Sequence, residues 1–235
     1  MVRWVHEKPV TPGFHPDVFA YGSRGIASVH VVERELILRS TPRIDPRILV
    51  LLTLGTGAAM ICTQRGLPVF HGNTVRVHGD DWMILGASGF GKSTFTAALI
   101  EAGAQLVAED VSVWEPEGVR PGAGRLKLWP DSRAAFLCSR TWSVVHPDFD
   151  KVATELPVVE SQRPLSRVIV LGDASAPVGL ADLMAQHRVP PLLERAHRSR
   201  WMNACAHVLQ TCEVRQIRRP ESFDACRRLA FDLVG

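Results

Sequence analysis

The stretch Gly86-Ala87-Ser88-Gly89-Phe90-Gly91-Lys92-Ser93-Thr94 determines which fold the rest of this chain is expected to have. It matches the Walker A pattern, in which four variable residues separate a glycine from a Gly-Lys-Ser sequence. The glycines permit tight turns with positive φ, so several backbone N–H groups and the lysine can surround phosphate oxygens. The stretch therefore predicts a site for a nucleoside triphosphate, with ATP as the expected ligand.

The flanks of this stretch have the pattern that a genuine phosphate-binding loop requires. Residues 82–85 form a short apolar run, which is typical of a buried strand. Residues 95–102 have apolar side chains at spacing i, i+3, i+4 and i+7, and Gly103 follows where a helix commonly ends. The sequence thus predicts the order strand, loop, helix, with the positive end of the helix dipole directed at the bound anion.

The expected contacts to the nucleotide come from the whole loop. Lys92 places a positive charge near the β- and γ-phosphates and counts as a catalytic candidate, and the Ser93 hydroxyl suits Mg²⁺. The residues expected to hold ATP are Gly86, Ala87, Ser88, Gly89, Phe90, Gly91, Lys92, Ser93 and Thr94.

A second acidic signal follows the next apolar run. Residues 105–108 read as a strand and are followed by Glu109 and Asp110, which is an arrangement like Walker B. Adjacent residues at a strand end point in different directions. We therefore expect one carboxylate to face the metal and the other to face the hydroxyl that receives the phosphate.

Composition narrows the classes of function. The chain has 235 residues, 46% hydrophobic and 22% charged, with a formal net charge of +3. This balance fits one large globular domain, or a domain with an extension, and does not favour nucleic-acid binding. The five cysteines are odd in number and form no C-x-x-C pair, which favours reduced thiols and a cytoplasmic location.

The remaining chain is predicted to be one α/β domain with an N-terminal layer over 1–65 and a catalytic region over 66–235. Residues 1–20 are expected to be a loose arm, and residues 26–39 one or two strands. The apolar residues 48–62 are expected to lie in a buried helix over 46–63, capped by Asp45 and Pro46, and not in a membrane span.

Further elements are expected along the second part. A β-hairpin over 74–85 leads into the Walker A stretch, and the polar, proline-containing residues 140–164 are expected to be a surface segment. Strands are predicted at 125–128, 168–171 and 214–218. Helices are predicted from Asp131, at 178–187, 191–199 and 201–211, and over 220–234.

A series of landmarks between residues 71 and 110 resembles the catalytic domain of HPr kinase/phosphorylase and its wider clan. The landmarks are His71-Gly72, the hairpin, the loop at 86–93 and the acid pair after Val107-Ala108. That clan includes HPr-kinase-like peptide kinases of lasso-peptide gene clusters and is distantly similar to ATP-dependent phosphoenolpyruvate carboxykinase. A weaker resemblance extends over 66–233.

The resemblance implies a single P-loop domain with a mixed sheet, ATP and Mg²⁺ as cofactors, and transfer of the γ-phosphate to a serine hydroxyl. It implies Glu109 as the better candidate for the base and Asp110, with Ser93, for metal contact. It also implies that His71 orients a carboxylate or relays the proton. We expect this last role to fail if the ring lies more than about 8 Å from both carboxylates.

Departures from the family pattern limit what the resemblance implies. Glu109 stands where the family has aspartate, and an E-x-R-G-x-G signature is not found. These differences disfavour HPr as substrate and reverse phosphorolysis. Lys127 and Arg133 are expected to be surface charges.

Several functions stay open from the sequence. The first is a serine kinase acting on a peptide or protein, including a lasso-type precursor. A true HPr serine kinase/phosphorylase, a P-loop ATPase or nucleotide-binding accessory protein, and a carboxykinase-type enzyme are the alternatives. The expected partner is a substrate carrying the acceptor serine, without nucleic acid or a membrane span, and homo-oligomer formation is left open.

Overall fold

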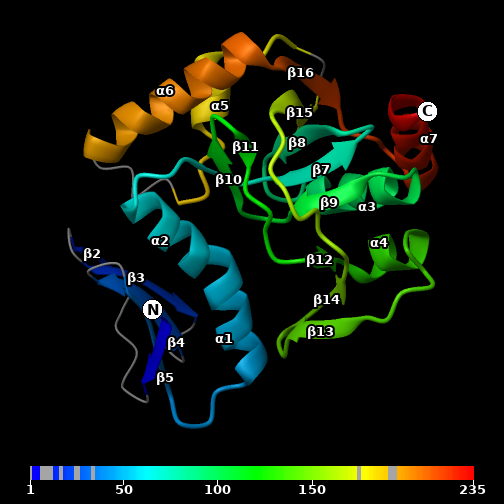
Figure 1. Ribbon diagram of the computed structural model, residues 1–235. Coiled ribbons are helices and arrows are strands. Elements are labelled where there is room, and N and C mark those ends of the chain that lie inside the picture. Colours follow the sequence, from blue (N-terminus) through cyan, green and yellow to red (C-terminus); the bar gives the residue numbers. More distant parts are fainter. Residues whose placement is uncertain are drawn as a thin grey trace.

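The computed structural model describes residues 2–5, 13–15, 18–23, 27–32, 35–173, 176–189 and 195–235. It is a mixed α/β fold with several sheets (Figure 1). A central sheet lies between two layers of helices. A second five-stranded sheet, near the N-terminus, is followed in the chain by one long helix that leads toward the central sheet.

The central sheet carries the Walker A stretch at the end of its middle strand. In spatial order its strands are β16 (Glu213–Arg218), β15 (Leu165–Gly172), β8 (Asp80–Gly86), β7 (Asn73–Val77) and β9 (Gln105–Ala108). β16, β15 and β8 are parallel, whereas β7 is antiparallel to both β8 and β9. The predicted hairpin before the loop is confirmed, because β7 and β8 pair through a turn at His78 and Gly79, both with positive φ.

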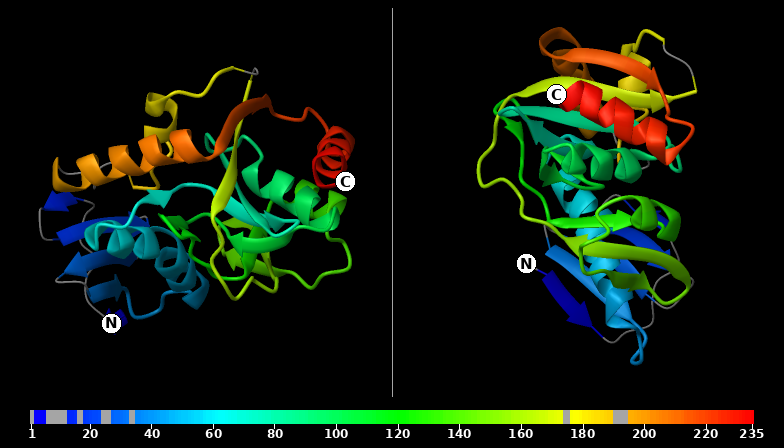
Figure 2. Two further views of the ribbon diagram at one scale, coloured as in Figure 1. Left: turned by 45° about the horizontal axis from the view of Figure 1, so that its top comes forward. Right: turned by 90° about the vertical axis from the view of Figure 1, so that its right-hand side faces the viewer.

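Alternate residues of β8 face the two helical layers. Trp82 and Ile84 lie in one apolar cluster with α3 (Lys92–Glu101) and α7 (Phe223–Val234). Met83 and Leu85 lie in a second cluster with α5 (Leu180–Met184) and α6 (Arg195–Thr211). The views in Figure 2 show these helices on opposite faces of the sheet. The strand is therefore buried on both sides, which explains its continuous apolar run.

The prediction of a loose arm over 1–20 is wrong for its described residues. β1 (Val2–Val5), β2 (Gly13–His15) and the start of β3 (Val18–Ser23) lie in a sheet with β4 (Ala27–Val32) and β5 (Glu35–Ser40), in the order β1-β5-β4-β3-β2. Residues 6–12 and 16–17 lie outside the described part. β1 pairs in parallel with the distant β5, a long-range pairing that local periodicity does not reveal. The strands expected over 26–39 are confirmed as β4 and β5.

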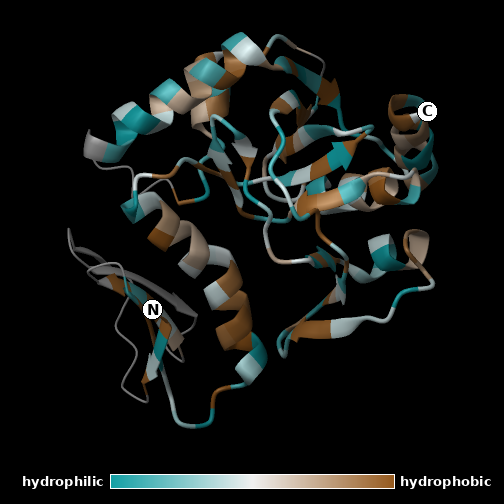
Figure 3. Ribbon diagram, viewed as in Figure 1, coloured by the Kyte–Doolittle hydropathy of each residue, from teal (hydrophilic) through white to brown (hydrophobic). Residues whose placement is uncertain are grey.

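The predicted helix is confirmed and runs from Pro46 to Gln64, but only one face of it is buried, and Val50 and Leu54 are exposed. It consists of α1 (Pro46–Leu52), a π-helical turn η1 (Thr53–Gly57) and α2 (Ala58–Gln64), and Asp45 accepts a hydrogen bond from Arg47 N at 2.9 Å. By length and composition this helix resembles a membrane span. Its apolar side packs on the N-terminal sheet, and Figure 3 shows the hydrophobic character of α1.

The π-helical turn contains Gly55 and Gly57, and close contacts explain why glycine is needed at Gly57. A Cβ on Gly57 would lie 2.9 Å from Leu52 O and 3.1 Å from the Leu36 side chain, so the helix approaches the sheet closely only with glycine there. A Cβ on Gly55 would lie 3.6 Å from Asp110 Oδ2. The N-terminal helix therefore reaches the acid pair, and single-turn π-bulges are frequent at functional sites.

The surface segment predicted for 140–164 has mostly exposed or half-buried residues, but it also contains two strands that were not predicted. A three-stranded antiparallel sheet contains, in this order, β12 (Arg125–Leu128), β14 (Phe149–Glu155) and β13 (Ser143–His146). The short helix α4 (Pro130–Ala135) follows β12 in the chain. The prolines of this segment, at positions 147, 157 and 164, lie between or after the two strands and do not interrupt them. A further sheet contains β11 (Gly118–Val119), β10 (Ser112–Glu115) and β6 (Val69–Phe70).

The helices of the C-terminal part differ in length from the predictions. The segments expected at 191–199 and 201–211 join in one helix over Arg195–Thr211, and residues 190–194 lie outside the described part. The helix expected over 178–187 is confined to Leu180–Met184. α7 begins at Phe223 because the Ser222 hydroxyl caps it by accepting a hydrogen bond from Ala225 N.

Candidate functional site

The Walker A stretch lies between β8 and α3, in the predicted order of strand, loop and helix. Gly89 and Gly91 have φ of 84° and 86°, which glycine adopts without strain. Gly86 has φ of 141°, and a Cβ there would lie 2.7 Å from Leu171 O of the neighbouring strand. Glycine is therefore required where the loop leaves the sheet.

Lys92 folds back over the loop. Its Nζ donates hydrogen bonds to Gly86 O at 2.8 Å and Ala87 O at 3.2 Å, and the residue is only 8% exposed. Burial lowers the pKa of Lys92. The ammonium group thus holds the loop in shape and presents a poorly solvated positive charge at its mouth.

Glu109 is directed at the first turn of α3. Its Oε1 accepts a hydrogen bond from Ser93 Oγ at 3.4 Å, and its Oε2 lies 2.9 Å from Lys127 Nζ. The side chain is 4% exposed. Burial raises the pKa of Glu109 in spite of the Lys127 charge, so this carboxylate favours any additional positive charge beside it.

Asp110 points to a different side, because its backbone has φ of 66° in the left-handed region. Its Oδ1 lies 3.3 Å from His71 Nε2. Its Oδ2 lies 3.2 Å from Lys127 Nζ and 3.1 Å from Arg188 Nη2. The two acids therefore share Lys127 but face separate surroundings, as expected for adjacent residues at a strand end.

The charges around Asp110 fix its protonation. Burial opposes ionisation, but the hydrogen bond from His71 and the charges of Lys127 and Arg188 hold the pKa of Asp110 well below its usual value. The hydrogen bond to Asp110 favours a protonated His71, but burial, Arg188 and Lys92 outweigh it and lower the pKa of His71. His71 is thus a neutral imidazole that donates from Nε2 to an ionised carboxylate.

The distance of 3.3 Å between His71 and Asp110 is well below the limit of about 8 Å beyond which the predicted relay role would fail.

Asn73, at the start of the hairpin, is a site residue that was not predicted from the sequence. Its Oδ1 accepts a hydrogen bond from Asp110 N at 2.8 Å, and its Nδ2 donates to Thr96 Oγ1 at 2.9 Å. Asn73 therefore connects α3 to the acid pair and supports the backbone conformation of Asp110.

Lys127 was expected to be a surface charge, and that expectation is wrong. The residue is 9% exposed and lies between both carboxylates, which raise its pKa in spite of burial. The same expectation for Arg133 is confirmed, since Arg133 is exposed on α4. Alternation along β12 turns Lys127 inward, and the pairing of β12 with β14 covers it.

The segment 186–188, far along the chain from the Walker A stretch, completes the site. No sequence motif marks this segment. Gln186 Oε1 accepts a hydrogen bond from Gly86 N at 3.1 Å, and Gln186 O accepts one from His71 N at 2.7 Å. Arg188 from this segment pairs with Asp110. A buried strand bridge at His187 holds the segment against Phe70, so only tertiary packing brings it to the loop.

Two cavities with a shared wall lie along the site. A cavity of about 330 Å³ lies over the loop and the acids, and a larger one of about 620 Å³ lies beside α1. Both cavities are lined by His71, Ser88, Asp110, Lys127, Trp129 and Lys151. Asp110 therefore stands where the two meet.

The expected nucleotide contacts do not all line the cavity over the loop. The loop residues that line it are Ser88, Gly89, Gly91, Lys92, Ser93 and Thr94. Gly86 and Ala87 instead bond to Lys92 beneath the loop. Phe90 points to another cavity on the far side, lined also by α7 and its connection to β16.

His187 anchors the segment that carries Gln186 and Arg188. The residue is 3% exposed, its ring lies edge-on to Trp201 at 4.8 Å between centroids, and Nδ1 accepts a hydrogen bond from Val189 N. Burial lowers the pKa of His187 from 6.5 to about 4. The folded state therefore holds a neutral ring that would otherwise gain a proton below neutral pH.

We expect this histidine to make the fold sensitive to acid. Between pH 6.5 and 4 the unfolded chain binds more protons at this residue than the folded chain, so the free energy of unfolding falls as the pH falls. The total loss is about 3 kcal/mol from a shift of this size. His187→Asn keeps an acceptor for Val189 N but does not titrate there. Urea unfolding of both proteins across this pH range tests the prediction, and parallel stability curves would contradict it.

Comparisons with known proteins find a distant structural likeness. No protein-family model and no curated protein matches the sequence. Among solved structures, the chain is similar to the Hpr(Ser) kinase/phosphatase from Coxiella burnetii, with 20% sequence identity and a TM-score of 0.28. The match covers 45% of this chain and 59% of that chain.

Proposed function

We propose that this protein is an ATP-dependent kinase that transfers the γ-phosphate to a serine hydroxyl of a peptide or protein. The observation that carries the proposal is the meeting of two cavities at Asp110. One cavity contains the Walker A stretch, and the other is large enough for an acceptor. An ionised carboxylate at such a junction suits the proton transfer that accompanies phosphoryl transfer.

Positive charge supports a phosphate-binding role for the first cavity. Lys92, Lys127 and Lys151 line it, against the carboxylates of Glu109 and Asp110. Arg188 adds a further charge next to Asp110, and no described residue accepts a hydrogen bond from its buried Nε. Triphosphate oxygens would satisfy these donors and neutralise the excess charge.

The oxygen groups beside the loop fit a magnesium ion. Ser93 Oγ and the buried Glu109 carboxylate are hard oxygen ligands, and Glu109 favours an added cation. Among the described residues no group of three or more His, Cys, Asp or Glu side chains forms a metal cage. That agrees with Mg²⁺, which is commonly held by one or two carboxylates together with substrate phosphates and lowers the charge of the transferring group.

The contacts of the two acids favour a division of roles opposite to the one that the resemblance implies. We assign Glu109 to the metal, because it is the acid that contacts Ser93. We assign Asp110 to the acceptor hydroxyl, because it lines the larger cavity and pairs with His71. His71 then acts as a positioning residue that holds the carboxylate by a neutral hydrogen bond.

These groups can account for the bond that forms, the bond that breaks and the proton that is released. The serine oxygen attacks the γ-phosphorus, the bond from that phosphorus to the bridging oxygen breaks, and ADP leaves with the electron pair. Asp110 accepts the proton of the serine hydroxyl. Lys92, Lys151 and Arg188 stabilise charge on the phosphate oxygens, where a buried and therefore poorly solvated cation is most effective.

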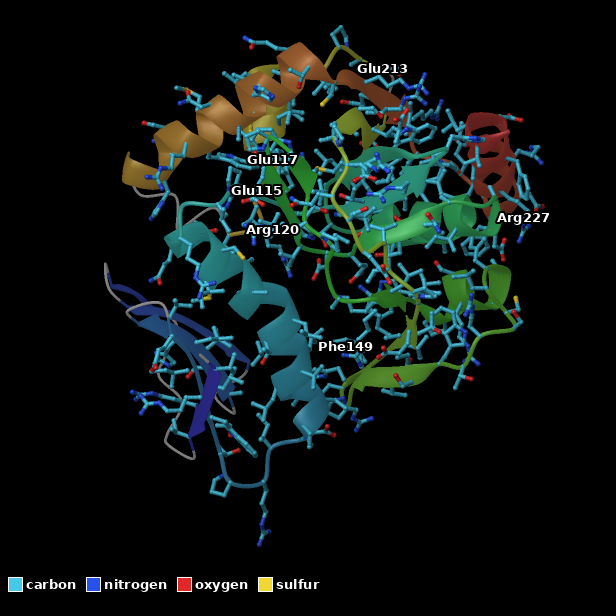
Figure 4. The ribbon with its side chains drawn as sticks, in the orientation of Figure 1. Glu115, Glu117, Arg120, Phe149, Glu213 and Arg227 are labelled. Carbon is cyan, nitrogen blue, oxygen red and sulfur yellow. The ribbon has the colours of Figure 1, made fainter. Side chains whose placement is uncertain are left out.

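The lining of the larger cavity supports a peptide as acceptor. Ile48 and Leu51 from α1 form one wall, and Trp129 and Phe149 form another. Figure 4 shows Phe149 in the space between α1 and the β13–β14 strands. An extended segment with an apolar residue beside its serine would bury that residue here. Among ribosomally made precursor peptides, the lasso-type precursors are the candidates that the sequence resemblance implies.

Binding and transfer test the proposal together. Lys92→Ala should weaken binding of Mg·ATP by about 10-fold or more, because it removes a charge-assisted contact to the phosphates. Calorimetry on the wild-type and variant proteins measures this, with Arg133→Ala as a control that removes an exposed charge of the same sign. Equal ATP affinity in wild type and Lys92→Ala would contradict the proposal.

Mass spectrometry of serine-containing peptides and proteins after incubation with Mg·ATP measures the transfer itself. A gain of one phosphate on a serine supports the kinase. ATP hydrolysis at full rate without any phosphorylated acceptor, including the peptides encoded beside this gene, would support the ATPase alternative instead.

A further inference from the structure

A third cavity lies on the other side of the Walker A stretch and plays no part in the proposed transfer. Its volume is about 310 Å³, and its walls come from the loop, the first turn of α3 and the connection from β16 to α7. The residues that line it are Gly89, Phe90, Gly91, Thr94, Phe95, Arg219, Pro220, Glu221, Ser222, Phe223 and Cys226. A volume near the lower end of the range for ligand pockets suits a small planar group.

This cavity shares part of its wall with the one over the acids. Gly89, Gly91 and Thr94 line both. The γ-phosphate is expected near Asp110 on one side of these residues. The α-phosphate and the rest of a nucleotide must therefore leave on the other side, where the third cavity begins.

The chemistry of the lining is that of a site for an aromatic ring. The guanidinium of Arg219 lies over the Phe90 ring at 5.4 Å from its centroid, and its Nε lies 3.9 Å from Asp173 Oδ1. Phe223 and Pro220 add apolar surface, and Glu221 adds a carboxylate able to accept from an exocyclic amine. Arginine planes and aromatic faces are the groups on which nucleobases stack.

We propose that this cavity binds the purine base of the nucleotide, with Arg219 and Phe90 as its stacking residues. The inference rests on the proposed function, since it names the second half of the same nucleotide site. Neither residue carries out chemistry, so they determine affinity and base preference and leave phosphate binding to the loop.

The test compares ligands that share the phosphates but differ in the base. Calorimetry with Mg²⁺ and ATP, CTP or inorganic tripolyphosphate is measured on wild type, Arg219→Ala and Phe90→Ala. We expect wild type to bind ATP more tightly than CTP and tripolyphosphate. Each variant should lose about 5- to 30-fold in ATP affinity, the range expected for a cation–π or stacking contact, with tripolyphosphate affinity unchanged within about two-fold.

Arg228→Ala is the matched control, because it removes the same charge from an exposed position of α7 outside the cavity. It should leave all three affinities unchanged. Arg219 is 53% exposed and its backbone hydrogen bond to Gly172 is kept, so Arg219→Ala is expected to fold.

The outcomes separate the two proposals. Equal wild-type affinity for ATP, CTP and tripolyphosphate, or equal losses for ATP and tripolyphosphate in the variants, would overturn the base site while the phosphate site stands. Tripolyphosphate binding that does not respond to Lys92→Ala would overturn the proposed function, and the base site with it.

Discussion

Asp110→Asn is expected to lower the rate of phosphoryl transfer by about 10²- to 10⁴-fold, the range for removing a positioned proton acceptor. Asparagine has the same shape and tolerates the left-handed backbone that φ of 66° requires. The variant therefore removes the charge that accepts the proton without a steric change. ATP affinity should stay within a few-fold of wild type, because Asp110 contacts Asn73, His71, Lys127 and Arg188 and not the Walker A stretch that is proposed to hold the phosphates.

Single-turnover transfer to a peptide substrate with a free acceptor serine, together with calorimetry of ATP binding, measures both quantities. Asp131→Asn is a suitable control, since that residue is exposed at the start of α4. Thermal unfolding of each protein establishes that the fold is kept. A loss of ATP affinity as large as the loss of rate, or a rate within about three-fold of wild type, would contradict the role assigned to Asp110.

The order of elements around the Walker A stretch could be predicted because the signals are local. The glycines of the loop, the apolar run before it and the helical spacing after it each follow from backbone geometry within a few residues. The adjacent acids were likewise expected to diverge, and Glu109 and Asp110 do so. The sequence does not, however, indicate in which direction each turns, because the positive φ of Asp110 depends on the contact of its N–H with Asn73.

The groups that surround Asp110 could not be predicted, because they depend on contacts between distant segments. Arg188 and Gln186 reach the site only because His187 is buried against Phe70 and Trp201. Lys127 on β12 is buried by the pairing of β12 with β14, and β14 lies in the segment that was predicted to be a surface segment without strands. The prediction of a loose N-terminal arm was wrong for the same reason, because the partner strand of β1 lies more than thirty residues further along the chain.

Gly55 illustrates how the N-terminal layer takes part in the site. Composition marked its helix as buried, and the helix does pack on the N-terminal sheet. Its π-helical turn also brings Gly55 next to Asp110 and Arg188. The boundary expected at residue 65 therefore separates two parts of the sequence whose side chains line one cavity, with Ile48 and Leu51 on one side and His71 on the other.

Glu109→Gln is expected to change the dependence on magnesium, which Asp110→Asn should leave nearly unchanged. Removing the carboxylate beside Ser93 should raise the Mg²⁺ concentration for half-maximal transfer by about 10- to 100-fold, as found when groups that support a metal are lost. At low Mg²⁺ the rate should fall sharply, and added Mg²⁺ should restore part of it. Lys127 keeps its contact with Asp110 in this variant, so the site does not lose all compensation for that buried charge.

Magnesium titrations of transfer by wild type, Glu109→Gln and Asp110→Asn decide between the two assignments of the acid pair. If Glu109 faces the metal, only Glu109→Gln shifts the titration, and only Asp110→Asn has a defect that Mg²⁺ does not restore. The reverse pattern would contradict the assignment made from the contacts and restore the one that the resemblance implies. The two readouts differ because the carboxylates, although adjacent in sequence, have different surroundings: Glu109 lies beside the Ser93 hydroxyl, and Asp110 lines the larger cavity, which Glu109 does not line.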